Sequence, residues 1–157
     1  MKVGEVCKSK VVTIRGTEEL AAAARCMRER HVGYLIVVEP LAQGVEPAGG
    51  AGEKPIGVLT DRDLVVTVMA GGLEPGSLKV EDVMTRWPVT AREDDTVTDA
   101  LMKMRGIGVR RLPVVSAKGA LVGILALDDV LDCVAAELHG IVSSIRQEQR
   151  VECALRP

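Results

Sequence analysis

The stretch Val6–Val38, VCKSKVVTIRGTEELAAAARCMRERHVGYLIVV, returns later in the chain as Val83–Val115, VMTRWPVTAREDDTVTDALMKMRGIGVRRLPVV. The two stretches align without a gap. Eleven positions are identical, and in the first copy they are Val6, Val12, Thr13, Arg15, Ala23, Met27, Arg28, Val32, Leu35, Val37 and Val38. Two copies are too few for a solenoid, so the repeat predicts a closed pair around a pseudo-two-fold axis, with a cleft that suits a ligand.

The match continues beyond these stretches, but there the matching residues of the two copies are separated by fewer residues. The segment 57–59 (GVL) meets 123–125 (GIL), and Asp63 meets Asp129. The first copy therefore holds extra residues, which fall in 39–55, EPLAQGVEPAGGAGEKP, with four glycines and three prolines. This composition predicts a surface loop, either a tolerated insertion or a functional lid.

The repeats predict an α/β (α+β) fold made of two β-α-β-β-α units packed as a pseudo-two-fold pair. The first unit spans 3–74 and the second 78–138, with glycines and prolines between them, and 139–157 forms a helical tail. Each unit alone would bury too little surface to be stable, so we expect the two to pack face to face. The tail keeps a helical period with mixed charge and could contact a partner chain.

The expected elements follow from the spacing of apolar residues. Thr96 and Asp99 form a capping-box pattern, and Pro113 predicts an edge or strand-start position for its strand. Glu18 and Glu19 are expected in the first turn of a helix, where the helix dipole favours them. Strands are expected at 11–14, 34–38, 56–59, 112–115 and 121–125, and helices at 17–30, 61–69 and 127–139.

Composition and charge exclude several classes of function. The net charge is −2 and aromatic residues make up 1% of the chain, which argues against direct nucleic-acid binding by charge or by base stacking. The N-terminus has no apolar signal segment, and no apolar run is long enough to span a membrane. We therefore expect a cytoplasmic protein without membrane contact.

The cysteines and histidines do not form a recognised metal motif. Cys7, Cys26, Cys133 and Cys153 lack CxxC spacing, which favours reduced thiols, with a redox switch as the alternative. The two histidines, one of them His31 in a turn after a helix, lack ligand partners at a known spacing. No metal site is predicted.

The segment 57–63, GVLTDRD, carries the candidate chemistry. A strand ends in Thr60 and a helix opens, with Asp63 three residues on. One interpretation is a structural capping box. The other is a ligand site, because helix N-termini receive phosphate, a carboxylate can accept hydrogen bonds from a ribose diol, and Arg62 supplies a forked cation.

Over about residues 3–138 the chain resembles a tandem cystathionine-β-synthase (CBS) domain pair, also called a Bateman module. The resemblance rests on the Val-Thr pairs with their following helices, on RRLPVV at 110–115 and on GVLTDRD at 57–63. It implies binding of AMP, ADP, ATP, and sometimes NAD or S-adenosylmethionine, between the repeats. This regulatory ligand would be the only small molecule bound, with no cofactor.

The resemblance also implies roles for individual residues. Thr60 would face phosphate or ribose, Asp63 would bind the ribose hydroxyls, and the basic pair Arg110 and Arg111 could reach phosphate across the pseudo-dyad. The residues implied to frame the adenine are Val12, Thr13, Tyr34 and Ile36. Another interpretation of the two arginines is a solvated edge or salt bridges in a dimer.

The two copies differ at the positions that matter for binding. Ala126 replaces Thr60, so the second copy keeps the carboxylate of Asp129 and loses the hydroxyl. The residues matching Arg110 and Arg111 in the first copy are glycine and tyrosine. This asymmetry predicts one good site per chain, formed by Thr60 and Asp63 with one of the arginines.

The resulting hypothesis is a regulatory module, not an enzyme, that senses an adenine nucleotide, changes conformation and signals to an unknown partner protein. The alternative is a ligand-independent scaffold for dimerisation or protein interaction. Pairs of this kind usually form homodimers through helices, which implicates the apolar sides of 61–69 and 127–139.

Overall fold

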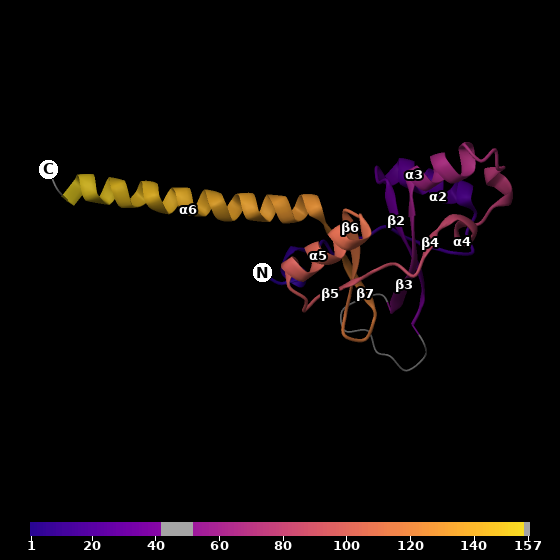
Figure 1. The fold of residues 1–157 in the computed structure, drawn as a ribbon, viewed down its shortest axis with the longest axis horizontal. Coiled ribbons are helices and arrows are strands. Elements are labelled where there is room, and N and C mark those ends of the chain that lie inside the picture. The colour runs from indigo at the N-terminus through magenta and orange to yellow at the C-terminus, as the bar shows by residue number, and fades with distance from the viewer. Residues whose placement is uncertain (42–51, 156–157) are drawn as a thin grey trace.

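The computed structural model describes residues 1–41 and 52–155, which form two small lobes and a long C-terminal helix (Figure 1). The first lobe contains a sheet in the order β1-β2-β3-β4, and the second a sheet in the order β5-β6-β7. Elements of the first lobe are β1 (Thr13–Arg15), α2 (Leu20–Arg30), β2 (Tyr34–Pro40), β3 (Glu53–Thr60), α3 (Asp61–Asp63), η1 (Leu64–Met69), η2 (Pro75–Ser77), α4 (Val80–Val83) and β4 (Thr85–Arg86). Those of the second are α1 (Val3–Val6), β5 (Ala91–Arg92), α5 (Val97–Ile107), β6 (Arg111–Val115), β7 (Leu121–Ala126) and α6 (Leu127–Leu155). This arrangement confirms the expected mixed fold of two sheets with helices.

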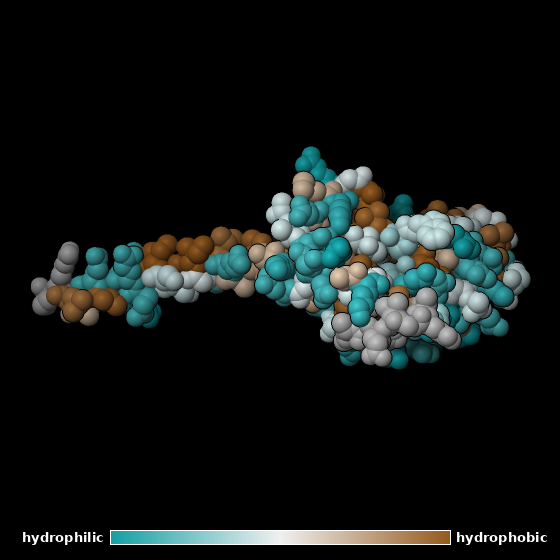
Figure 2. All heavy atoms as spheres, turned by 90° about the horizontal axis from the view of Figure 1, so that it is seen from below, coloured by the Kyte–Doolittle hydropathy of each residue, from teal (hydrophilic) through white to brown (hydrophobic). Residues whose placement is uncertain are grey.

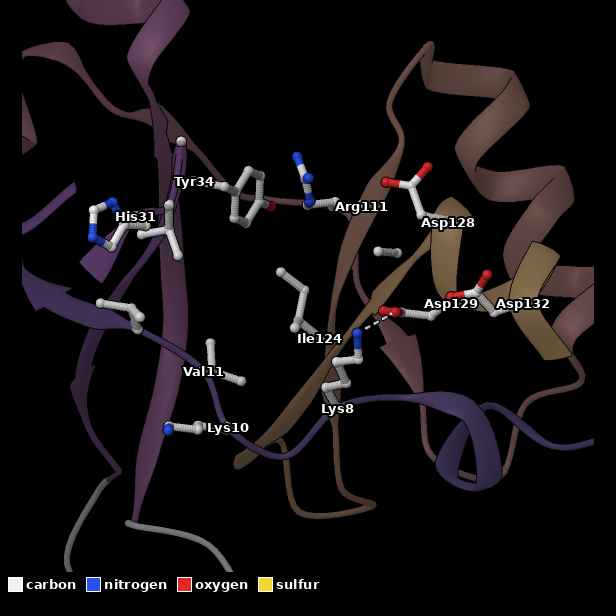
Figure 3. Close-up of a pocket in the computed structure, with 14 residues that line it drawn as sticks. Lys8, Lys10, Val11, His31, Tyr34, Arg111, Ile124, Asp128, Asp129 and Asp132 are labelled. Carbon is white, nitrogen blue, oxygen red and sulfur yellow. Dashed lines mark ion pairs between the residues drawn. The ribbon is translucent and has the colours of Figure 1, made fainter. Parts of the chain in front are cut away.

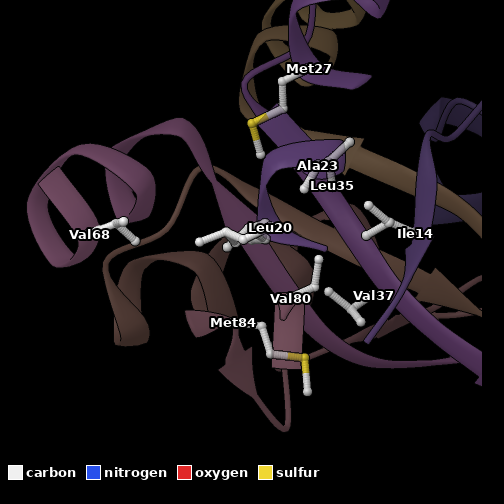
Figure 4. Packing of buried hydrophobic residues seen from close by; sticks show 10 residues of the cluster. Ile14, Leu20, Ala23, Met27, Leu35, Val37, Val68, Val80 and Met84 are labelled. Atoms are coloured by element: carbon white, nitrogen blue, oxygen red, sulfur yellow. The ribbon is translucent and has the colours of Figure 1, made fainter. Parts of the chain in front are cut away.

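Each lobe has the same core built at equivalent positions. Parallel pairing of β1 with β2, and of β5 with β6, places the helix between the two strands over one face of each sheet. In the first lobe Leu20, Ala23 and Met27 of α2 face the buried side of β2, as Figure 4 shows. The matching positions of α5 are buried against β6. The repeat in the sequence is thus a repeat in packing.

Each lobe is completed by the segment that precedes the other copy. Val3 of α1 is fully buried in the core of the second lobe, and Val80 of α4 is fully buried in the core of the first. Lys8 pairs with Ile124 of β7, and Thr85 pairs with Val58 of β3 in the equivalent place. The chain therefore crosses between the lobes before each repeat, and the lobes cannot separate as independent units.

Two glycines make these crossings possible. A Cβ at Gly57 would collide with Sδ of Met84. A Cβ at Gly123, the equivalent position of β7, would lie 2.9 Å from the carbonyl oxygen of Lys8 and 3.0 Å from Sγ of Cys7. Glycine at both positions lets the incoming segment approach the strand closely.

Several expected boundaries are wrong. The helix expected at 17–30 begins at Leu20, because the backbone around Glu18 and Glu19 bonds to the segment after η2: Leu20 N–H donates to Leu78 O and Val80 N–H to Glu18 O. The loop expected at 39–55 is shorter, since Pro40 pairs with Glu53 at the end of the hairpin. The rest of that loop lies outside the described residues.

The expected edge or strand-start position of Pro113 is also wrong, because Pro113 is the third residue of β6, the central strand of its sheet. Its partner in β7 is Ile124, whose N–H and C=O both bond to Lys8 on the opposite side. On the other side, β5 begins to pair only at Val114. The nitrogen of Pro113, which carries no hydrogen, therefore lies at a position where neither neighbouring strand requires an N–H donor.

The end of β3 leads into an unusual helix. The expected helix at 61–69 starts as α3 and continues as the π-helix η1, with Ala70 N–H donating to the carbonyl of Val65. His31 ends α2 in the left-handed conformation, in the turn where it was expected. Thr96 caps α5: Asp99 N–H donates to the threonine hydroxyl oxygen, and that hydroxyl donates to the Asp99 carboxylate.

Candidate nucleotide site at the lobe interface

The motif at the end of β3 forms a closed hydrogen-bonded cap. Thr60 donates from its N–H (2.8 Å) and from its hydroxyl (2.7 Å) to Oδ2 of Asp63, and Asp63 N–H donates back to the hydroxyl at 3.2 Å. The capping box that the sequence suggested is therefore present in the structure. The same contacts hold the Thr60 hydroxyl at the start of the helix, where the first N–H groups point outward.

Tyr34 and Arg111 meet where the two lobes face each other. They occupy equivalent positions at the start of β2 and β6, and pair across their hairpins with Thr60 and Ala126 respectively. The guanidinium carbon of Arg111 lies 6.0 Å from the centre of the Tyr34 ring. Burial raises the pKa of the Tyr34 phenol, so the ring stays neutral beside the cation.

On one side of this pair is a cavity of about 330 Å³, here named the arginine hollow. Its charged side chains are Arg62, Arg110 and Arg111 against the single carboxylate of Asp61. It is lined by Gly33, Tyr34, Thr60, Asp61, Arg62, Gly108, Val109, Arg110 and Arg111, from both lobes. Three guanidinium groups beside a helix start form a surface suited to phosphate oxygens.

On the other side is a cavity of about 410 Å³, here named the aspartate hollow and drawn in Figure 3. Its lining includes Lys8, Lys10, Val11, Val12, His31, Val32, Ile124, Ala126, Asp128, Asp129 and Asp132, together with Gly33, Tyr34 and Arg111 shared with the arginine hollow. The three aspartates come from the first turns of α6. Three cations balance them, so this hollow lacks the positive excess of the other.

Lys8 forms an ion pair with Asp129, the carboxylate that matches Asp63 in the second copy. Its ammonium nitrogen lies 2.5 Å from Oδ1 of Asp129, with the lysine side chain largely exposed and the aspartate side chain 12% exposed. The hydrogen bond to Asp129 raises the pKa of Lys8, so the lysine remains charged at neutral pH. A ligand hydroxyl that binds Asp129 must compete with this ammonium group.

The two hollows divide the residues that the sequence singled out. Thr60, Arg62 and Arg110 line the arginine hollow, Val12 and Asp129 line the aspartate hollow, and Tyr34 and Arg111 line both. Thr13, Ile36 and Asp63 line neither: Thr13 pairs with the fully buried Ile36 inside the sheet, and Asp63 lies beneath Thr60. The backbone carbonyl of Val12 is also engaged in the sheet, because it accepts a hydrogen bond from Ile36 N–H at 3.2 Å.

Sequence reasoning missed Lys8, Asp128 and Asp132 as lining residues. Lys8 belongs to the segment that crosses to the other lobe, and a repeat in the sequence does not say which copy such a segment completes. Asp128 and Asp132 lie one turn apart with Asp129 between them, a cluster that the sequence shows but that reads as an ordinary acidic helix start.

The described residues also bear on metals and membranes. Within 1–41 and 52–155, no group of three or more histidine, cysteine, aspartate or glutamate side chains is arranged to hold a metal ion. Among the helices of the same residues, none is both long enough and apolar enough to cross a bilayer.

Comparison with other proteins agrees with the duplicated architecture. An uncharacterized protein of Methanopyrus kandleri is 34% identical over 131 residues, which cover 83% of this chain and 61% of that protein. The CBS domain-containing protein YhcV of Bacillus subtilis is 33% identical over 128 residues, covering 82% and 81%. An inosine-5'-monophosphate dehydrogenase of Korarchaeum cryptofilum is 32% identical over 120 residues, and the chain spans 21% of its length.

Solved structures share the fold. A CBS domain protein from Pyrobaculum aerophilum complexed with AMP superposes with a TM-score of 0.67 at 24% identity, covering 82% of this chain and 89% of that one. A hexameric CBS-CP12 protein from bloom-forming cyanobacteria gives 0.69 at 28% identity, covering 99% and 84%. The CBS domain family model matches residues 3–70 and again 80–136. With two matched repeats that build two lobes around a shared interface, the chain belongs to the CBS domain family as a tandem pair.

Proposed function

We propose that the chain is a regulatory module that binds one adenine nucleotide in the arginine hollow. The binding changes the affinity of the chain for a partner protein. The observation that carries this proposal is the lining of the hollow: Arg62, Arg110 and Arg111 against one carboxylate, at the interface of two lobes. Its volume lies within the range of small-molecule sites. We place no catalytic step in either hollow.

The charge of the hollow favours phosphorylated ligands. Arg62 comes from the first lobe and Arg110 and Arg111 from the second, so a phosphate group would draw both lobes toward it. AMP, ADP and ATP are therefore expected to bind more tightly than S-adenosylmethionine, which carries a positive sulfonium; NAD would present a diphosphate. The Pyrobaculum relative complexed with AMP supports an adenylate in this fold.

Ligand binding would act on a partner through the relative placement of the lobes. A nucleotide that contacts Thr60 in one lobe and Arg110 in the other stabilises the placement in which both contacts are made. A partner that binds the two placements with different affinity then responds to the nucleotide. This mechanism requires the two-lobed interface and no covalent chemistry.

Calorimetric titration with AMP, ADP, ATP, NAD and S-adenosylmethionine tests the proposal. A ligand at 100-fold over its Kd would stabilise the fold by about 2.7 kcal/mol in a thermal-shift assay. Arg110→Ala is expected to weaken AMP binding about tenfold or more, equivalent to ~1.4 kcal/mol. Arg105→Ala, which removes an exposed arginine of α5 outside both hollows, is the matched control and would leave binding unchanged.

A scaffold role is the second candidate, favoured by an exposed apolar surface on the first lobe. Val65, Val66 and Met69 of η1 are 55%, 56% and 72% exposed, which is unusual for a helix of an isolated domain. We propose that this face contributes to a homodimer, and the hexameric relative supports self-association within the fold. Absence of binding for every nucleotide above, with self-association retained, would favour the scaffold over the sensor.

A further inference from the structure

Asp61 is the one carboxylate among the described residues that line the arginine hollow. It is the first residue of α3 and follows Thr60, the last residue of β3. Its side chain is exposed to solvent, and the charged groups around it are the guanidinium groups of Arg62, Arg110 and Arg111. A single negative group among three positive ones bears directly on which anion the hollow accepts.

The carboxylate of Asp61 is held close to the backbone. Its Oδ1 accepts a hydrogen bond from Arg62 N–H at 2.8 Å. Its Oδ2 lies against Gly33, where a Cβ would come within 2.5 Å of it, so a side chain at position 33 would push the carboxylate away. The carboxylate therefore engages one of the first N–H groups of the helix, which would otherwise be available to a ligand.

The second copy has a different pair of residues at the equivalent positions. The hydrogen bond from Asp61 N–H to Gly33 O, at 3.1 Å, is matched by one from Leu127 N–H to Arg110 O, at 2.9 Å. The first copy thus combines glycine with a carboxylate where the second combines arginine with an apolar side chain. The carboxylate of one lobe and the arginine of the other line the same hollow.

The charges of the hollow are not neutralised by ion pairs. Within residues 1–41 and 52–155, the ion pairs of the structure involve neither Asp61 nor the three arginines. Three guanidinium groups and one carboxylate give the lining a net charge of +2, because the Tyr34 phenol stays neutral. A phosphate monoester carries about −1.5 to −2 at pH 7, which matches this lining.

We propose that Asp61 determines how much negative charge the hollow accepts, so that it favours a ligand with one phosphate, such as AMP, over ADP and ATP. This inference rests on the proposed binding of a nucleotide in the arginine hollow. The repulsion from the carboxylate grows in proportion to the charge of the ligand, whereas one phosphate already balances the lining. A group that repels the unwanted ligand is a common source of specificity. Asp61 is thus a specificity-determining residue and does not itself bind phosphate.

Asp61→Asn tests the charge alone. Asparagine keeps the size of the side chain and an oxygen that can accept from Arg62 N–H. The variant is expected to bind AMP about threefold more tightly than wild type. Because the repulsion energy is proportional to charge, the gain for ATP, with about twice the charge, is about ninefold. Adenosine carries no charge and should bind both proteins equally. Calorimetric titration of the full chain measures the three affinities, in EDTA so that no divalent cation neutralises the phosphates.

Glu29→Gln is the matched control. Glu29 is an exposed residue of α2 in the same lobe, and it lines neither hollow. The substitution makes the same change, a carboxylate to an amide, at a distance from the site. It is expected to leave the affinities for adenosine, AMP and ATP unchanged.

Self-association is not expected to disturb this comparison. The helix expected at 127–139 extends to Leu155 as α6 and includes the helical tail, and apolar side chains form a row along its projecting part (Figure 2). The row includes Leu138, Ile141 and Ile145, none of which lines the arginine hollow. Light scattering coupled to gel filtration should therefore give one mass for wild type, Asp61→Asn and Glu29→Gln.

Salt distinguishes repulsion from a direct contact. At about 1 M salt the screening length falls to about 3 Å, so the gains of Asp61→Asn should largely disappear. A ratio of AMP to ATP affinity that is the same in wild type and Asp61→Asn would overturn the inference and leave the proposed function intact. A loss of affinity for adenosine in Asp61→Asn would also overturn it, because Asp61 would then bind a hydroxyl or amino group of the ligand. A wild-type chain that binds none of the three ligands would overturn the proposed function and this inference with it.

Discussion

Arg111 lies over the ring of Tyr34, with 6.0 Å between its guanidinium carbon and the ring centre, although the two residues occupy the same position in the two copies of the repeat. At a perfect two-fold axis the same residue would meet itself. Two arginines there would repel each other, and two tyrosines would leave no cation at the interface. The different residues at this one position join the lobes and separate the two hollows.

Removing this contact should loosen the lobes. Tyr34→Ala is expected to destabilise the fold by more than the ~0.5–2 kcal/mol of a cation–π contact, because the buried ring is lost as well. Tyr34→Phe keeps the ring and should cost much less. Urea denaturation of the two variants measures the difference, and equal destabilisation by both would contradict the contact with the ring face.

The two threonine caps offer a matched pair for testing Asp63. Asp63→Ala and Asp99→Ala each remove the carboxylate of a threonine-based cap, at α3 and α5 respectively, so each should cost about 0.5–2 kcal/mol of stability. Only Asp63→Ala is expected to abolish AMP binding, since Asp63 holds Thr60 at the arginine hollow. Calorimetry at a temperature where both variants are folded separates the two effects. Retained binding in Asp63→Ala would refute a role for this motif in the site.

The aspartate hollow should not bind a second nucleotide. Calorimetry is expected to give one AMP per chain, and Asp129→Ala should leave this stoichiometry and the affinity nearly unchanged. Lys8→Ala would add no second site, because removing the ammonium leaves Asp128, Asp129 and Asp132 to repel phosphate. Two equivalents of AMP bound by the wild-type chain would contradict the asymmetry of the two copies.

The glycine at the crossing in the second lobe predicts a destabilised variant. Gly123→Ala is expected to cost about 1–3 kcal/mol, because its Cβ would meet the backbone of Lys8, which cannot move without disturbing the pairing with Ile124. Gly106→Ala is the control: nothing lies within 4 Å of its Cβ, and alanine favours the helix by up to about 1 kcal/mol. Thermal denaturation should therefore move the two midpoints in opposite directions.

Asp95 predicts a dependence of stability on pH. A hydrogen bond from Lys103 at 2.7 Å lowers the pKa of Asp95 below its usual value near 3.8. A lowered pKa in the folded state contributes stability above that value, and this contribution disappears as the pH falls through the folded-state pKa. The deficit of Asp95→Asn relative to wild type should thus be present at neutral pH and vanish in strong acid. Urea midpoints measured across this range would show it.

The sequence predicted most of the fold because the repeat and the apolar periods are local signals. Leu20, Ala23 and Met27 show their helical face in the sequence alone, and Thr96 with Asp99 marks a helix start. Boundaries failed where distant backbone intervened. Glu18 and Glu19 suit a first helical turn, yet their backbone bonds to the segment around Val80, which no local pattern reveals.

The candidate site was predicted in composition but not in arrangement. Thr60, Arg62, Arg110 and Arg111 do gather in one hollow, as the alignment of the copies indicated. Val12 instead lies with Asp129, because its segment leaves the second lobe, where Lys8 pairs with Ile124, just before it enters β1 of the first lobe. Which copy contributes each residue of the site depends on that crossing. A repeat in the sequence does not show which lobe the leading segment of each copy joins.

The crossing also has a consequence for how such a chain can arise. A lone copy built on this plan would lack the segment that completes its sheet and would have to take it from another molecule. Two identical copies could do so mutually, as a homodimer in which each donates its leading segment. Duplication and fusion would then turn a concentration-dependent assembly into a unimolecular one. Only after that step could Thr60 and Ala126, or Tyr34 and Arg111, diverge separately, since identical subunits must change both faces at once.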